Sequence, residues 1–81
     1  MPHSEHVYNI AILQSFILDR GLSHREFCAA CGITEKHLGN VFAGRTRMAR
    51  AKVRRKFIDG LRKLNADERI VLNAFLVIQG P

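Results

Sequence analysis

Residues 22–47 read LSHREFCAACGITEKHLGNVFAGRTR, and this stretch decides the fold because it specifies two short helices separated by one glycine. Ser23 and Glu26 stand three residues apart, which is the spacing of a capping box at a helix start. Gly32 ends this first helix, because glycine enters the left-handed backbone conformation without a Cβ penalty. The pattern predicts one short helix that stops at Gly32 and a second helix directly after it.

The second helix is predicted over residues 34–43. Thr34 is suited to cap its N-terminus, and Gly44 follows its last turn. Its apolar residues share one face, while the outer face is small or polar. Gly39 lies within this helix, where glycine costs roughly 1 kcal/mol relative to alanine. We interpret Gly39 as a mark of close approach to a partner.

Residues 22–50 resemble the helix-turn-helix of the phage repressor and Cro family, often called XRE-type. The resemblance is carried by a short helix followed by GIT at residues 32–34, and by a second helix that closes in GR at residues 44–45. It implies an all-α, lambda-repressor-like bundle of about five helices. It also implies that the second helix enters the major groove of double-stranded DNA, which is about 12 Å wide.

Carried over residue by residue, the resemblance assigns base contacts to the start and middle of the second helix. These residues are Glu35, Lys36, His37 and Asn40. Lysine can donate to guanine and asparagine can pair with adenine through two hydrogen bonds. Contacts to the DNA backbone fall on His24, Arg45, Arg47 and Arg50, to which we add the nearby Lys52, Arg54 and Arg55. The alternative for the base-contact set is an ordinary exposed helix surface.

The charge distribution agrees with a nucleic-acid partner. The 81 residues, which we expect to form a single domain, carry a formal net charge of +6. Nine of the 13 lysines and arginines lie between positions 45 and 63, against one acid, Asp59. A basic segment beside a DNA-reading helix is suited to bind phosphates, although it could also be a solvated helix face.

Three further helices are expected around this pair. Apolar periodicity predicts helices over residues 5–20, 48–64 and 66–79. For the last of these, Asn65 and Glu68 have the spacing of a capping box. The first and last of the three are apolar on nearly all sides, which is more than one core requires.

The excess of apolar surface on the terminal helices predicts a homodimer, in which residues 5–20 and 66–79 meet their counterparts across a twofold axis. The alternative is that both helices pack on each other within one subunit. A dimer would present two DNA-reading helices about 34 Å apart, which suits an operator with an inverted repeat.

Other classes of function are disfavoured by the sequence. Cys28 and Cys31 form a CxxC motif, but no second pair accompanies it, and we expect buried core thiols with no metal or cofactor. The acids are scattered, so we expect no enzyme. Neither a signal peptide nor a membrane span is recognisable, which favours the reducing cytoplasm, at the nucleoid of a bacterial or phage-infected cell.

The sequence therefore predicts a small dimeric transcription regulator, a repressor of phage, prophage or antitoxin type, with no small-molecule ligand. The alternative is a helix-turn-helix scaffold that binds protein or RNA through its basic helix, residues 47–63.

Overall fold

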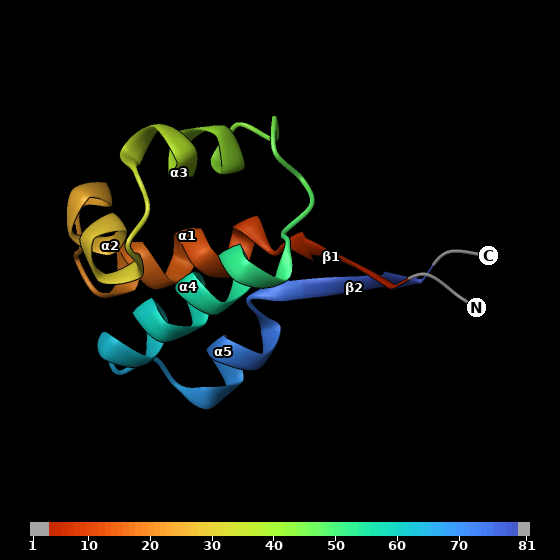
Figure 1. The fold of residues 1–81 in the computed structure, drawn as a ribbon. Helices are drawn as coiled ribbons and strands as arrows, with labels where there is room; N and C mark the ends of the chain where they lie inside the picture. The colour runs from red at the N-terminus through yellow and green to blue at the C-terminus, as the bar shows by residue number, and fades with distance from the viewer. Residues whose placement is uncertain (1–3, 80–81) are drawn as a thin grey trace.

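The computed structural model describes residues 4–79. Along this part of the chain, five helices follow the first strand and precede the last, and the two strands pair with each other (Figure 1). The elements are β1 (Ser4–Tyr8), α1 (Ile10–Asp19), α2 (His24–Cys31), α3 (Glu35–Phe42), α4 (Ala51–Lys63), α5 (Glu68–Asn73) and β2 (Phe75–Gln79). A mostly helical fold with five helices is thereby confirmed for this part of the chain. The two strands were not expected, and they correct the all-α prediction.

The helix expected over residues 5–20 is wrong in its first part, where the chain forms β1. The helix begins at Ile10 because Asn9 caps it, with the side-chain oxygen accepting from the Ile12 N–H at 3.5 Å. The Asn9 side-chain nitrogen donates to the Asn73 carbonyl at 2.9 Å. Asn9 therefore ties the start of α1 to the end of α5, which is a long-range contact that helical periodicity cannot reveal.

The helix expected over residues 66–79 is also wrong in its second part, which forms β2 antiparallel to β1. The capping prediction fails as well, since Asp67 is the N-cap of α5 and accepts from the Arg69 N–H at 2.9 Å. Asn65 instead adopts a left-handed conformation, φ 58°, just after α4. An uncharged apolar run suits either a buried helix or a strand, and the pairing with β1 decides for the strand.

The two helices of the central stretch are confirmed with their caps. The Ser23 hydroxyl accepts from the Glu26 N–H at 3.1 Å, and the Glu26 carboxylate accepts from the Ser23 N–H at 3.0 Å. Gly32 ends α2 in the left-handed conformation, φ 70°. The Thr34 hydroxyl then accepts from the His37 N–H at 3.0 Å and starts α3. Local sequence signals therefore set both ends of the turn between α2 and α3.

Phe57, on α4, lies at the centre of the core. Its ring centroid is 5.3 Å from that of Tyr8, 6.0 Å from that of Phe27 and 6.0 Å from that of Phe75. The helix expected over residues 48–64 thus exists as α4, but it begins only at Ala51. One aromatic side chain joins α4 to β1, α2 and β2, and this packing holds the small sheet against the helices.

Candidate nucleic-acid interface

Helix α3 has one buried face and one exposed face. Leu38 and Val41 are fully buried in the core. Glu35, Lys36 and Gly39 are exposed. In Figure 1, α3 lies at the edge of the fold, across α4 from α5. Two of the four residues expected to contact bases, Glu35 and Lys36, are therefore free to reach a partner.

His37, like Asn40, is half-buried, whereas Glu35 and Lys36 are exposed. The Tyr8 hydroxyl is 3.5 Å from Nε2 of His37, and the His37 ring centroid is 6.5 Å from that of Phe57. Burial raises the pKa of Tyr8, so its hydroxyl remains protonated at neutral pH. His37 is thus placed between α3 and the core, where it helps to position the helix.

Asn40 organises the turn that follows α3. Its backbone carbonyl accepts from the N–H groups of Arg45 and Thr46, at 2.9 and 3.3 Å. Its side-chain oxygen accepts from Nη1 of Arg45 at 3.3 Å. Gly44, with φ 78°, allows the chain to reverse at this point. Asn40 thereby connects a residue of the base-contact set directly to the first arginine of the backbone-contact set.

The segment after α3, residues 44–50, is called the basic loop here, and β1 holds it in place. The Tyr8 N–H donates to the Arg47 carbonyl at 3.1 Å, and the Ala49 N–H donates to the His6 carbonyl at 2.7 Å. Nη1 of Arg54 donates to the Ala49 carbonyl at 2.6 Å. Three hydrogen bonds thus fix a segment that has little regular secondary structure.

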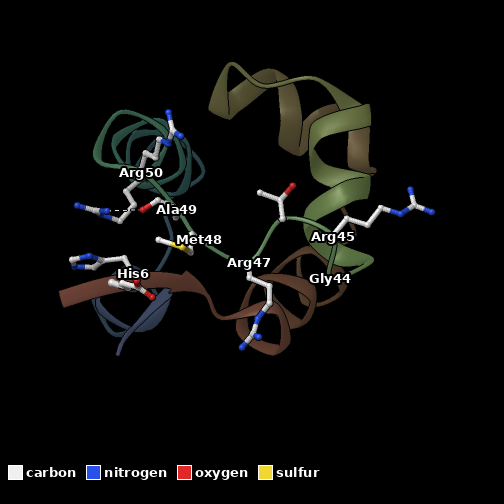
Figure 2. Close-up of a pocket in the computed structure, with 10 residues that line it drawn as sticks. His6, Gly44, Arg45, Arg47, Met48, Ala49 and Arg50 are labelled. Atoms are coloured by element: carbon white, nitrogen blue, oxygen red, sulfur yellow. Dashed lines mark hydrogen bonds between the residues drawn. The ribbon is translucent and has the colours of Figure 1, made fainter. Parts of the chain in front are cut away.

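A cationic pocket lies along the basic loop (Figure 2). Arg45, Arg47, Arg50 and Arg54 line it, together with Glu5 from β1. The first three arginines are exposed. Figure 2 shows Arg45 and Arg47 extending from the loop in different directions. This surface can bind anionic groups at several points, whereas Arg54 is half-buried and serves mainly to hold the loop.

The remaining candidates lie around this region. Lys52 and Arg55 are exposed on α4. His24 is exposed at the start of α2, and its ring centroid lies 5.5 Å from that of Phe42 at the end of α3. Glu35 forms an exposed ion pair with Arg25 at 3.8 Å. An exposed pair of this kind is weak, so Glu35 can leave it for another partner.

Both cysteines are free and buried in the core between the helices. Burial, with a smaller contribution from Cys28, raises the pKa of Cys31 to about 12. Burial also raises the pKa of Cys28, whose Sγ donates to the Thr34 carbonyl at 3.6 Å. Such thiols are protonated and poor nucleophiles. Within residues 4–79, no three His, Cys, Asp or Glu side chains are grouped so that they could hold a metal ion.

Sequence reasoning missed the contribution of β1 to this surface. Glu5 and His6 line the cationic pocket, although their segment was expected to be helical. It also missed the bond between Asn40 and Arg45, and the use of Arg54 as a clamp. A spacing of five residues between Asn40 and Arg45, across a glycine, is the one local signal that could have suggested that pair.

In the part of the chain that the structure describes, no helix has both the length and the apolar character needed to cross a membrane. Comparisons of the chain with protein-family models, with curated proteins and with solved structures found no match.

Proposed function

We propose that this protein is a sequence-specific regulator of transcription that binds double-stranded DNA as a homodimer. In this proposal α2 and α3 act as a helix-turn-helix, and α3 enters the major groove of an operator with an inverted repeat. The protein is then a small repressor of phage, prophage or antitoxin type, as the resemblance of residues 22–50 suggests. The basic loop binds the phosphates that flank the groove.

The observation that carries the proposal is the continuity between the exposed face of α3 and the basic loop. Asn40 joins the two through its hydrogen bonds with Arg45. A helix that reads bases needs phosphate contacts beside it, because those contacts set its register on the duplex. Here Asn40 holds the first of the cations, Arg45, beside the end of the helix, which suits the two tasks.

The exposed Gly39 within α3 is a second observation that supports the proposal. It lies exposed within α3, and a Cβ at this position would meet no heavy atom within 4 Å. Glycine therefore weakens the helix without relieving a contact in the described chain. A backbone that must come close to a surface outside the protein, such as the floor of a groove, would explain this residue.

The direct test is selection of bound sequences from a random double-stranded DNA library, followed by fluorescence anisotropy at two salt concentrations. We expect enrichment of a short inverted repeat that is bound at least about 1000-fold more tightly than bulk DNA. Weak binding without preference, abolished by salt, would contradict the proposal. A search for a protein or RNA bound by α4 would then follow.

Variants separate base reading from phosphate binding. Lys36→Ala should reduce discrimination at one base pair by about 1–3 kcal/mol. Arg47→Ala should weaken binding to all sequences equally and lower the salt slope by about 1. Arg69→Ala is the matched control, because it removes an exposed charge from α5 and should change neither quantity. Unchanged sequence preference in Lys36→Ala would argue against base reading by this residue.

Replacement of Asn40 has a mixed effect that follows from its position. Asn40→Ala should relax sequence preference and also loosen Arg45, since it removes the side-chain acceptor of that arginine. We therefore expect it to lower affinity for both specific and bulk DNA, unlike Lys36→Ala. Gly39→Ala should leave the fold intact and weaken binding to the operator.

A further inference from the structure

Asn40 and Arg45 form a connected pair of polar residues at the C-terminal end of α3. Nη1 of Arg45 donates to the side-chain oxygen of Asn40 at 3.3 Å, and the Arg45 N–H donates to the Asn40 carbonyl at 2.9 Å. Gly44, with φ 78°, reverses the chain between them. This reversal brings the Arg45 guanidinium back to the helix, although Arg45 itself belongs to the basic loop.

The other exposed arginines of the basic loop lie differently. Figure 2 shows Arg45 extending from the loop at the end of α3, whereas Arg47 extends in another direction. Arg50 lies at the N-terminus of α4. Among the hydrogen bonds within residues 4–79, only that of Arg45 joins a side chain of this loop to α3. Arg45 is therefore placed with α3, whereas Arg47 and Arg50 lie on the surface beside it.

The residues next to Asn40 on the exposed face of α3 are small. Lys36 precedes Asn40 by four residues and Ala43 follows it by three, so the three share one face of the helix. Gly39 and Ala43 are exposed, and a Cβ added at Gly39 would meet no heavy atom within 4 Å. Asn40 and Arg45 are thus the large polar side chains at this end of α3, and a partner surface can approach them closely.

The groups that this pair offers to a partner are mainly hydrogen-bond donors. A guanidinium has N–H donors and no acceptor, and the asparagine side chain has one oxygen and one NH₂ group. Because the Asn40 oxygen already accepts from Arg45, the NH₂ group of Asn40 and the other N–H groups of Arg45 remain. The ion pairs within residues 4–79 do not include Arg45. The pair therefore suits a partner that presents hydrogen-bond acceptors.

We propose that Arg45 contacts a base rather than a phosphate, that the base is guanine, and that Asn40 is the positioning residue for this contact. In the major groove guanine presents the acceptors O6 and N7, and the planar guanidinium matches them with two parallel hydrogen bonds. Adenine presents a donor in place of O6, which Arg45 cannot satisfy. The inference rests on the proposed function and deepens it by naming the base. It also moves Arg45 out of the backbone-contact set, where the resemblance places it.

The first experiment uses the unmodified full chain with altered DNA. Once an operator has been selected, each of its guanines is replaced in turn by inosine or by 7-deazaguanine, and dissociation constants are measured by fluorescence anisotropy. Inosine keeps O6 and N7 but lacks the minor-groove amine, whereas 7-deazaguanine lacks N7. We expect one guanine in each half-site where inosine is tolerated and 7-deazaguanine raises the dissociation constant at least about fivefold. Equal binding of all the altered operators would overturn the inference.

Arg45→Lys shows whether Arg45 is the residue that contacts this guanine. Lysine keeps the positive charge but lacks the planar fork. We expect the preference for guanine over adenine at that one base pair to fall at least about fivefold, while the salt dependence of binding stays the same. Arg69→Lys is the matched control, because it makes the same replacement at an exposed residue of α5. An equal effect of Arg45→Lys on all sequences, or no effect, would refute the inference.

A double-mutant cycle tests the positioning role of Asn40. Asn40→Ala should reduce the preference for guanine at the same base pair as Arg45→Lys, and the double variant should show no further loss there, because the two residues act as a unit. Lys36→Ala and Arg45→Lys, which affect different base pairs, should instead combine additively. Additive losses from Asn40→Ala and Arg45→Lys would refute the coupling. Circular dichroism checks that each variant keeps its helices.

The selection step separates a failure of this inference from a failure of the proposed function. If no sequence is enriched, the proposed function is refuted, and the inference is refuted with it. If an inverted repeat is enriched but its preference for guanine does not depend on Arg45, the inference alone is refuted. Loss of that preference in Lys36→Ala instead of Arg45→Lys would likewise refute only the inference.

Discussion

Replacement of Gly60 by alanine tests how closely α2 and α4 pack. Gly60 is buried within α4, and a Cβ added there would lie 2.7 Å from Cα and 2.9 Å from the backbone nitrogen of Cys31. It would also collide with the Cys31 sulfur. Side-chain rotation can move a sulfur, but it cannot move the α2 backbone. The two helices must therefore separate to admit one methyl group.

The expected change follows from two opposing contributions. Alanine is favoured over glycine in a helix by roughly 1 kcal/mol. Overpacking a close core contact costs about 1–3 kcal/mol, and the upper end applies because the clash involves backbone atoms. We therefore expect Gly60→Ala to lower the free energy of unfolding by about 2 kcal/mol. In a domain of this size, that corresponds to a fall in melting temperature of about 10 °C.

Gly39→Ala is the matched control, since it makes the same substitution in another helix where no heavy atom lies within 4 Å of the added Cβ. It should raise the free energy of unfolding by about 1 kcal/mol. Thermal and urea unfolding, followed by far-ultraviolet circular dichroism, measure both variants. Adding Cys31→Ala should not restore the stability of Gly60→Ala, because Cα and N remain. Unchanged or increased stability of Gly60→Ala would refute the close packing.

Three further predictions concern single contacts. Arg54→Ala should lower the free energy of unfolding by about 1 kcal/mol, because it removes the hydrogen bond to the Ala49 carbonyl. It should also weaken the proposed DNA binding, because the basic loop is then less firmly held. A loss of affinity without any change in unfolding would show that Arg54 binds phosphate directly. The Ser23 backbone N–H, with its hydroxyl, holds the pKa of Glu26 below its ordinary value. The ionised Glu26 therefore stabilises the fold at pH values above its ordinary pKa, and this stabilisation is lost as pH falls through the lowered pKa. Glu26→Gln should show a flatter acid limb when unfolding is measured against pH, and an identical limb would count against the capping box. Cys31, with its pKa near 12, should resist iodoacetamide in the folded protein and react in urea; fast labelling without denaturant would contradict its burial.

The extent to which this fold could be predicted varies with the range of the interactions that decide each element. The ends of α2 and the start of α3 depend on Ser23, Gly32 and Thr34, whose partners are within a few residues. Such contacts depend only on the local sequence, and the predicted ends of α2 and start of α3 were confirmed. The exposed position of Lys36 also followed from helical periodicity.

The positive charge of the candidate surface could be predicted from the sequence, but the contacts that hold this surface in place could not. The cluster of arginines after α3 is visible in the sequence, whereas the segments that hold it are distant. Arg47 and Ala49 are bonded to β1, and His37 is turned inward by contacts with Tyr8 and Phe57. Which side chains of a helix reach a partner depends on the elements that cover the helix, and those elements come from other parts of the chain.

By itself, the sequence determined the paired helices α2 and α3, their caps, the apolar faces that form the core, and the concentration of positive charge beside α3. Only the tertiary structure decided that the two end segments are strands. The run around Val77 is compatible with either a helix or a strand, and it becomes a strand because its backbone pairs with β1 from the other end of the described chain. Local signals act through neighbouring residues, whereas a β-ladder requires a partner that periodicity cannot locate.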